Sequence, residues 1–402
     1  MANQAAPAQT AQQQQMSMQQ QNAAIRSAVL KQSVRLRQPI FNQAWVPTST
    51  PQLQFSPNFI GLLRRFTVVV TGTVTNNDES ATATLGDLGV AGMFDPNQGV
   101  VLTDLNGYNR IQTGVWHILQ VESQKRAKAY GLAWTPIAAS TPWANAGAWL
   151  PIQQPTASLE AGDSSTFRLQ FDIPVCYMPD DLRGGIWISV VNATMRAVLT
   201  ANQQMFVAAD TDDTFCFYSG TVNLGLTNVN VTVYQDYLDQ LPSSSQGQPA
   251  LPMMDLSTVY ELKKTQYANI APGVENPFPY TNLRRFLSTA TIFDSAPGTS
   301  PYRYAGSDVS YWALQTASQL YLWRLDPQMF SEMTRQQIGW DLPKGMYFFD
   351  HRRQPIYTPS YGNMQLLLNP ITAAAGAIVH IGYEDFADVN LLTQASGIPG
   401  GN

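Results

Sequence analysis

The chain has 402 residues, enough for two domains, and only 13% of them are charged, about half of the usual share. Aromatic residues make up 11%, with 27 Gly and 26 Pro. This composition favours a β-rich protein whose surface is largely covered by other chains, because charged residues are depleted at the centres of interfaces. Two cysteines, Cys176 and Cys216, are too few for a disulfide framework and suit a reducing cytoplasm, although their redox state stays open.

Charge divides the chain into two unlike parts. The first 77 residues hold six basic residues and no acidic one, whereas the rest hold 17 basic and 28 acidic residues. A basic end on an acidic body indicates that this end meets something anionic. The N-terminus lacks the apolar core of a signal peptide, and the apolar stretch 373–381 is too short to cross a bilayer. We therefore expect a soluble subunit.

An N-terminal arm is predicted for residues 1–44. Nine of its first 22 residues are Gln, and such a polar tract is expected to stay disordered until it meets a partner. Residues 23–37 are predicted to form a short helix with apolar residues on two sides and basic residues between them, ended by Pro39. The basic residues of this segment are Arg26, Lys31, Arg35 and Arg37.

Beyond Pro39 apolar residues recur at every second position, which is typical of strands. Two β domains are predicted, at 45–241 and 253–386, joined by a Ser- and Pro-rich linker at 242–252 and followed by a tail at 387–402. The segments 84–110 and 131–165 are rich in Gly, Pro, Ala and Asn, which indicates long surface loops. The predicted strands are 66–74, 167–173, 185–191, 221–234, 289–293, 345–349, 354–357, 364–368 and 377–383.

One helix is predicted within the second domain. Asp326 is its expected N-cap, Pro327 occupies the first helical position and Gly339 stands near the end. There is no detectable internal sequence repeat.

Residues suited to catalysis or metal binding are few. His117 and His380 are predicted to be structural histidines within strands, and His351 to lie in a hairpin turn. Asp210, Asp212 and Asp213 form a possible weak ion loop, but the glycine and distal glutamate of a calcium loop are missing, which favours a solvated loop. No nucleophile, phosphate-loop or zinc motif is present, so we predict no enzyme and no cofactor.

Two interpretations of the basic arm stay open. Its charges either contact acidic surfaces of neighbouring subunits or face anionic lipid headgroups at an inner surface. Each charge supplies about 1 kcal/mol near an anionic membrane, too little for one chain but ample over a large array. No aromatic residues interleave with the charges, so no specific nucleic-acid surface is expected.

The most specific sequence features lie around the linker and in the second domain. They are the stretches 231–242 (VTVYQDYLDQLP), 251–262 (LPMMDLSTVYEL), 285–294 (RFLSTATIFD), 342–350 (LPKGMYFFD) and 354–363 (QPIYTPSYGN). In order and spacing these stretches resemble the major capsid proteins of tectiviruses, which are tailless icosahedral double-stranded-DNA phages with an internal membrane.

The resemblance implies an all-β fold with minor helices, built from two eight-stranded jelly rolls in tandem, and a structural function. Three copies would form a pseudo-hexagonal trimer, since two rolls per chain give six similar corners. Such trimers build an icosahedral shell around the membrane, with the arm on the inner side. The implied partners are further copies, minor capsid, vertex and cement proteins, and membrane lipids. The implied locations are the virion and, during assembly, the host cytoplasm.

Two other functions were weighed against this one. A carbohydrate-binding β-sandwich, such as a receptor-binding viral spike, could use Trp134, Trp143 and Trp149 to stack on sugars. A two-domain β hydrolase is disfavoured by the missing nucleophile and metal motifs.

Overall fold

The fold was obtained as a computed structural model, which describes most of the chain. The described residues are 11–86, 88–130, 153, 155–178, 180–188, 194–206, 217–219, 223–243, 247–281, 283–295, 308–316, 318, 320–338 and 346–388.

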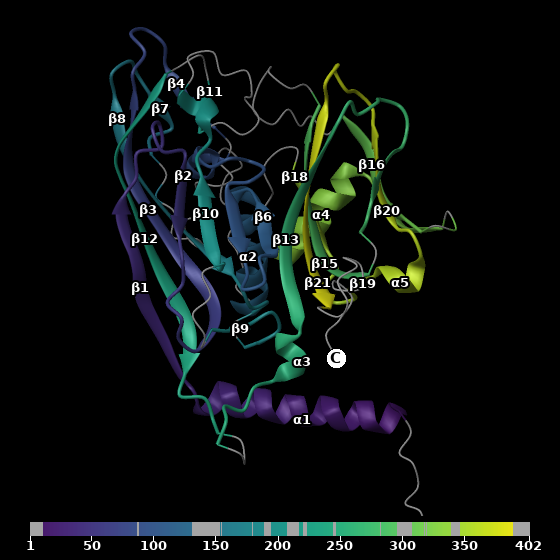
Figure 1. Ribbon diagram of the computed structural model, residues 1–402. Helices are drawn as coiled ribbons and strands as arrows, with labels where there is room; N and C mark the ends of the chain where they lie inside the picture. The colour runs from purple at the N-terminus through teal and green to yellow at the C-terminus, as the bar shows by residue number, and fades with distance from the viewer. Residues whose placement is uncertain are drawn as a thin grey trace, which may run out of the picture.

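The first half of the chain forms two facing four-stranded sheets (Figure 1). One sheet has the order β1 (Val34–Ala44), β12 (Leu224–Asp239), β3 (Leu62–Asn76) and β8 (Ser164–Pro174). The other has the order β2 (Gln52–Phe55), β10 (Arg196–Thr200), β5 (Val100–Thr103) and β6 (Asn109–Thr113). The short β9 (Ile186–Trp187) extends β3, and a small separate sheet contains β11 (Tyr218–Ser219), β4 (Ala83–Leu85) and β7 (Ser158–Leu159).

The second half repeats this arrangement. Its first sheet has the order β13 (Thr258–Ala268), β21 (Ile378–Asp388), β15 (Arg284–Asp294) and β18 (Met346–Asp350), with β19 (Ile356–Tyr357) also on β15. Its second sheet has the order β14 (Asn276–Pro279), β20 (Gln365–Pro370), β16 (Val309–Gln315) and β17 (Tyr321–Leu325).

The two halves have the same strand connectivity. When the short β4, β7, β9, β11 and β19 are set aside, each half has eight strands, and their sheet orders are 1-8-3-6 and 2-7-4-5. This is the order of a jelly roll, in which paired Greek keys leave few exposed sheet edges. The predicted pair of eight-stranded jelly rolls is therefore confirmed, although the sequence carries no detectable repeat.

The two rolls stand side by side and share one continuous sheet. The fifth strand of the first roll, β6, lies parallel to the first strand of the second roll, β13, with Ile111 opposite Leu262 and Gln112 opposite Lys263. This pairing joins eight strands into one path across the molecule, with β19 attached to the side. In Figure 1 the strands of both rolls run roughly upright.

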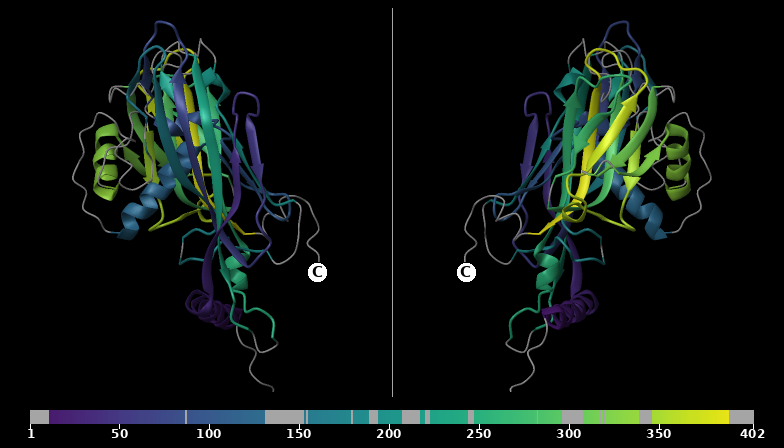
Figure 2. Two further views of the ribbon diagram at one scale, coloured as in Figure 1. Left: turned by 90° about the vertical axis from the view of Figure 1, so that its left-hand side faces the viewer. Right: turned by 90° about the vertical axis from the view of Figure 1, so that its right-hand side faces the viewer.

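The helices occupy two regions. A 22-residue helix, α1 (Ala11–Gln32), crosses the base beneath both rolls, and the short α3 (Met253–Leu256) lies just above it (Figure 1). In each roll one helix follows the fifth strand: α2 (Val115–Tyr130) and α4 (Pro327–Ile338). These two helices contact each other and lie on the same side of the molecule (Figure 2). The remaining short helices are α5 (Thr358–Tyr361), η1 (Gly89–Met93) and η3 (Gln203–Phe206).

Each roll has its own hydrophobic core because the strands alternate in side-chain direction. In β3 the alternate residues Phe66, Val68 and Val70 are fully buried and face the first core. In the second roll Trp312 and Phe286 are buried in a separate cluster with aromatic neighbours. Two cores explain why a chain of this length forms two rolls rather than one large barrel.

Most predicted strands are confirmed, several with longer bounds. The strands predicted at 66–74, 167–173, 289–293, 364–368 and 377–383 correspond to β3, β8, β15, β20 and β21, and 221–234 to β12. Of the strand predicted at 185–191 the described residues are 185–188, and only β9 among them is a strand; of 354–357 only the last two residues are a strand. The helix at Pro327 is confirmed, with Asp326 Oδ1 accepting a hydrogen bond from the Met329 N–H at 2.9 Å, whereas Gly339 lies outside the described residues.

Four expectations were wrong. The helix expected at 23–37 ends at Gln32, and the following residues belong to β1; the helix also begins earlier, so residues 11–22 are not disordered. Gln and Ala are strong helix formers, and α3 supports this helix from above. The segment 84–110 is no surface loop, because it contains η1 and β5 and most of its apolar residues are buried.

The fourth error concerns His117, which lies in α2 rather than in a strand. The predicted domain limits, 1–44, 45–241, 242–252, 253–386 and 387–402, stay predictions; β1 lies within the segment assigned to the arm.

Candidate functional site

The base of the molecule is where the predicted arm residues lie, and α1 is attached there by apolar packing. Val29 of α1 is fully buried in a small cluster with Leu62, Leu182 and Leu238. Ile25 and Leu30 pack against the same cluster, and Ile25 shares a helix face with Val29 because the two are four residues apart. The residues from Met16 to Gln21 have exposed side chains. One end of α1 is therefore anchored to the first roll while its beginning faces solvent.

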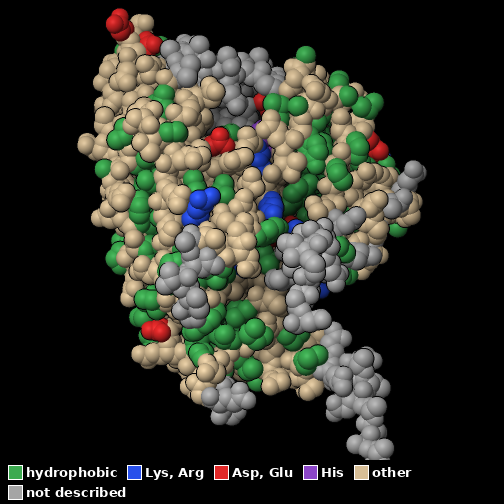
Figure 3. All heavy atoms as spheres, viewed as in Figure 1, with side chains coloured by type: hydrophobic (Ala, Val, Ile, Leu, Met, Phe, Trp, Pro, Cys, Tyr) green, Lys and Arg blue, Asp and Glu red, His purple; other side chains and the backbone are tan. Residues whose placement is uncertain are grey.

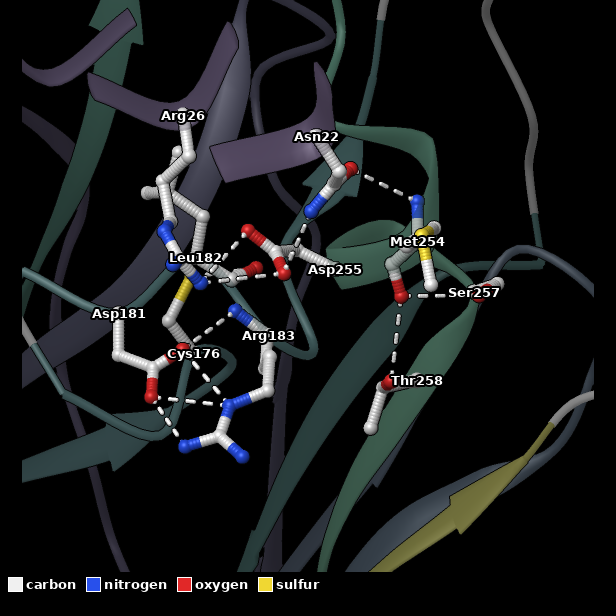
Figure 4. Close-up of polar contacts among 10 residues, drawn as sticks. All are labelled: Asn22, Arg26, Cys176, Asp181, Leu182, Arg183, Met254, Asp255, Ser257 and Thr258. Atoms are coloured by element: carbon white, nitrogen blue, oxygen red, sulfur yellow. Dashed lines mark hydrogen bonds and ion pairs between the residues drawn. The ribbon is translucent and has the colours of Figure 1, made fainter. Parts of the chain in front are cut away.

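Polar contacts attach α1 to α3 (Figure 4). Asn22 donates from Nδ2 to Asp255 Oδ1 at 3.0 Å and accepts at Oδ1 from the Met254 N–H at 3.1 Å. Arg26 lies 3.4 Å from the same carboxylate. Burial raises the pKa of Asp255, and the Arg26 charge and the Asn22 hydrogen bond oppose this. Asn22 thus both donates a hydrogen bond to α3 and accepts one from it, and this contact with Asp255 and Met254 is called the clamp below. Arg26 compensates the negative charge of Asp255.

Cys176 lies close to this junction and is a free, buried thiol (Figure 4). Burial raises its pKa to about 12, so the thiol is protonated at neutral pH. Its Sγ lies 3.9 Å from the Leu182 carbonyl oxygen. Because the thiolate is the reactive form, the buried and protonated Cys176 contributes to packing and is not a reactive nucleophile.

Four arginines surround one buried carboxylate at the start of β1. The Asp236 side chain is 1% exposed, and its oxygens lie 2.7 Å from Arg35, 3.4 Å from Arg37, 3.7 Å from Arg64 and 3.2 Å from Arg65. Burial disfavours the charged carboxylate, but the Arg35 hydrogen bond and the surrounding positive charges outweigh it and lower the pKa of Asp236. Arg65 also contacts Asp172 at 2.7 Å.

Most of the six basic residues among residues 1–77 therefore form ion pairs within the chain. Arg26, Arg35 and Arg37 pair with acidic residues of the same chain, as do Arg64 and Arg65. Lys31 is exposed and forms no ion pair within the described part of the chain. The side chains of Arg35 and Arg37 nevertheless remain 46% exposed. Whether the arm also faces lipid or a neighbouring subunit stays a prediction.

A second buried charge cluster connects the two rolls. Glu384 of β21 is fully buried and lies 2.7 Å from Arg352 and 3.2 Å from Lys125 of α2. Tyr260 and Ser288 donate hydrogen bonds to its two oxygens at 2.8 and 2.5 Å. Burial disfavours the Glu384 charge, but these four partners lower its pKa to about 2. Since Lys125 belongs to the first roll and the others to the second, the cluster fixes their relative position.

The three histidines are buried residues with a structural role. His117 Nδ1 lies 3.0 Å from Thr113 Oγ1, and burial lowers the pKa of His117 to about 3. His380 is in β21, and His351 follows β18 at the turn, as predicted. Burial also lowers the pKa of His351, to about 4, and that of His380. All three are neutral at physiological pH.

The surface near the base is poor in charge. In Figure 3 charged side chains are few and scattered, and hydrophobic ones gather around β9 and α3. Exposed apolar side chains at the base include Met16, Met18, Met253 and Met254. No helix in the described ranges is long and apolar enough to cross a membrane.

Two sets of candidate residues lie outside the described residues. They are Asp210, Asp212 and Asp213 of the possible ion loop, and Trp134, Trp143 and Trp149 of the possible sugar-binding surface. Among the residues that the structure does describe, no group of three or more His, Cys, Asp or Glu could hold a metal ion.

Sequence reasoning missed the acidic partners of the arm. Asp236 and Asp255 are distant in sequence from the arginines they bind, and no local pattern announces them. One signal was present: Arg35 and Arg37 alternate with Val34 and Leu36 at the period of a strand, which would have placed both arginines on one face of β1.

Family models match almost the whole chain. Residues 1–241 match the family described as P3 major capsid protein N-terminal, and residues 257–399 match P3 major capsid protein C-terminal. The major capsid protein P3 of Enterobacteria phage PRD1 is 31% identical over 381 residues, which cover 94% of this chain and 93% of that protein.

Solved structures resemble the fold at much lower identity. The STIV MCP, of the Sulfolobus Turreted Icosahedral Virus, matches with a TM-score of 0.61 and 9% identity, over 90% of this chain and 99% of that one. PBCV-1 VP54 matches with a TM-score of 0.52 and 11% identity, over 88% and 93% of the two chains. At these identities the matches support the double jelly-roll fold alone.

Proposed function

Because this chain belongs to the P3 major capsid protein family, and so is a structural protein of a virus capsid, we propose that it forms pseudo-hexagonal trimers. These trimers build an icosahedral shell around an internal membrane that encloses double-stranded DNA. The role is structural, with neither catalysis nor a cofactor. Assembly takes place in the host cytoplasm, and the finished shell includes minor capsid, vertex and cement proteins.

The tandem repeat of the jelly roll carries the proposal. Two rolls of equal connectivity stand side by side with parallel axes, so three chains supply six similar corners (Figure 1). A unit with six similar corners suits packing into a near-hexagonal lattice. The continuous sheet through β6 and β13 keeps the two corners of each chain rigidly related.

The position of α1 supports an inner location for the arm. The helix lies across one end of both rolls, and this end therefore differs from the other (Figure 1). The residues of α1 that can contact another surface include the exposed Lys31 and the exposed apolar side chains of Met16 and Met18. Apolar side chains beside a cation suit a lipid surface, and one weak contact per chain becomes strong when repeated over a shell.

The proposed trimer can be tested by measuring the mass of the purified protein in solution. Light scattering is expected to give the mass of three chains, and electron microscopy is expected to show pseudo-hexagonal particles. A monomer at every concentration, without assembly, would contradict the proposed function.

Deletion of residues 1–32 tests the arm, because it removes α1 and stops before β1. We expect the truncated chain to form trimers but to lose flotation with vesicles that contain anionic lipid. The matched control is Lys31→Gln, which keeps α1 and should lose only part of the binding. Equal flotation of truncated and full-length trimers would show that the arm does not contact lipid.

A further inference from the structure

We propose that the arginines at the beginning of β15 form a binding site for a phosphate group. The site is a pocket of the second roll that is lined by Arg183, Arg284 and Arg285. This inference goes beyond the proposed capsid function and does not depend on the trimer.

The pocket lies at the end of the molecule that carries α1. Thr258, the first residue of β13, lines the pocket and follows α3 closely in the chain, and α3 in turn contacts α1. Phe386, near the end of β21, lines it as well. Figure 4 shows Arg183 and Thr258 beside the clamp at Asp255. The pocket is therefore close to the junction of α1 with the rest of the fold.

Strand pairing and stacking place two arginines beside one aromatic ring. Arg285 of β15 lies opposite Phe386 of β21 and, on its other side, opposite Tyr357 of β19. The Arg183 guanidinium lies over the Phe386 ring, 4.5 Å from its centre, and the Arg285 guanidinium lies 5.7 Å from the centre of the Tyr357 ring. Because guanidinium groups stack on aromatic faces, both arginines are held in place before a ligand arrives.

The charges of the pocket do not balance. Arg183 donates a hydrogen bond to Asp181 at 2.9 Å, and Arg284 lies 2.7 Å from Glu261. Arg285 is exposed and forms no ion pair within the described part of the chain. One of the three positive charges is therefore left without an acidic partner, and such a surplus attracts an anion.

Both rolls carry the tetrapeptide Leu-Arg-Arg-Phe at the beginning of their third strand. It occupies 63–66 in β3 and 283–286 at the start of β15, and it is too short to count as a repeat of the rolls. The phenylalanine of each tetrapeptide is buried in the core of its own roll. The second arginines, Arg65 and Arg285, therefore hold equivalent positions one residue before a core side chain.

Arg65 has two acidic partners, whereas Arg285 has none. Arg65 lies opposite Asp236 of the eighth strand, contacts its carboxylate at 3.2 Å and contacts Asp172 of the sixth strand at 2.7 Å. Arg285 lies opposite Phe386 of the eighth strand, and the strand on its other side provides a tyrosine. The anion that the first roll supplies from its own chain is, at this position of the second roll, supplied by a ligand.

Size and donor geometry select a phosphate group. The pocket encloses about 190 Å³, less than the roughly 300–1,000 Å³ of sites that enclose whole small molecules. It can therefore hold one small anionic group while the rest of the ligand extends into solvent. Guanidinium groups bind phosphate through parallel N–H bonds, and three of them offer more donors than the two oxygens of a carboxylate accept. The Tyr357 hydroxyl lies at the wall of the pocket and can donate a further hydrogen bond.

A phosphate group at this end of the molecule has two sources, a lipid headgroup and a soluble phosphate compound. Both present the same oxygens to the arginines, so the pocket itself does not distinguish them.

Calorimetric titration of the full-length chain with glycerol 3-phosphate, at constant ionic strength, tests the pocket. We expect saturable binding that is at least tenfold weaker in Arg285→Gln. Because Arg285 is exposed, this variant should keep its circular dichroism and melting temperature. The matched control is Arg196→Gln, at an exposed arginine of β10, which should bind like the natural chain. Arg285→Lys keeps the charge but not the planar fork and should recover part of the affinity.

Two results would overturn the site: no saturable binding by the natural chain, or equal affinity of the natural chain and Arg285→Gln. Light scattering on the same samples shows separately whether trimers form, so a missing phosphate site and a missing trimer are distinguishable.

Flotation with vesicles distinguishes the two sources. The natural chain and Arg285→Gln, both at full length so that α1 contributes equally, are compared on phosphatidylcholine vesicles with and without phosphatidic acid. Weaker flotation of Arg285→Gln on the phosphatidic acid vesicles, with competition by glycerol 3-phosphate in the natural chain, supports the site and assigns it to a lipid headgroup. Equal flotation together with the calorimetric loss supports the site and assigns it to a soluble phosphate compound.

Discussion

Asp236 and Glu384 show how single residues keep a charge within this β-rich interior. Each carboxylate is 1% exposed or less, and each is surrounded by cations from other elements. An isolated buried carboxylate would take up a proton, but the ion pairs and hydrogen bonds lower the pKa of both. Several of the few charged residues of the chain are thus paired in its interior instead of facing solvent.

His351 allows the effect of a buried neutral group to be measured. Its pKa is about 4 in the folded protein and 6.5 in an exposed chain. Between these values the unfolded state binds the additional proton, so stability falls as pH falls, by up to about 1.4 kcal/mol per pH unit. We expect His351→Asn to have a less steep loss of unfolding free energy between pH 7 and pH 5, measured by urea denaturation. Identical slopes for the two proteins would contradict this account.

At the scale of elements, α1 combines a firm attachment at one end with a free beginning. Val29 and its apolar neighbours anchor the end of the helix, whereas the side chains of residues 16–21 are exposed and Asn22 near the middle is held by Asp255. Segments with few buried contacts open most easily. We therefore regard α1 as the element best suited to adapt to different surroundings in a shell.

Asp255→Ala tests this division of α1. The variant removes the carboxylate that Asn22 and Arg26 contact, but leaves the Val29 cluster. We expect faster amide hydrogen exchange around Asn22 and little change around Val29. The loss of global stability should be about 1 kcal/mol or less, since Arg26 is 35% exposed and such pairs are weak.

The matched control for this experiment is Asp163→Ala, at an exposed residue before β8. Equal protection of the first half of α1 in Asp255→Ala and in the natural sequence would show that the clamp does not hold the helix.

At the scale of the whole molecule, two cores are joined into one unit. The strand pair β6 and β13 makes a continuous sheet, and the Glu384 cluster bridges the rolls through Lys125. Aromatic contacts among Tyr177, Tyr260 and Phe386 reinforce the same junction. The rolls should therefore unfold together.

Lys125→Met tests this coupling. The substitution keeps an unbranched side chain, shorter by its charged end, and so removes the ion pair between Lys125 and Glu384 that joins the rolls. We expect a loss of up to about 3 kcal/mol, less than for a fully orphaned buried charge because Arg352 remains. Calorimetry should show two separated transitions instead of one. The control is Lys31→Met, at an exposed lysine of α1. A single transition in Lys125→Met would show that the shared sheet and the aromatic contacts couple the rolls without this ion pair.

The sequence by itself determined the β-rich class, the position of most strands, the capped helix at Pro327 and the family. These properties depend on local periodicity, local capping chemistry and residue identity, which are all present in short stretches of the chain. The segregation of charge was equally visible, but its meaning was not, because the partners of Arg26 and Arg35 are more than two hundred residues away.

Only the tertiary structure decided what those distant contacts do. Residues 34–37 form a strand rather than a helix because β12 provides a hydrogen-bonding edge and Asp236 holds both arginines. His117 lies in a helix because α2 must fit against β21, where Gly382 leaves room for its ring. The repeat of the jelly roll is likewise a property of strand order and not of residue identity. Packing between distant segments, which no local pattern records, therefore fixed the position of the arm and the junction of the rolls.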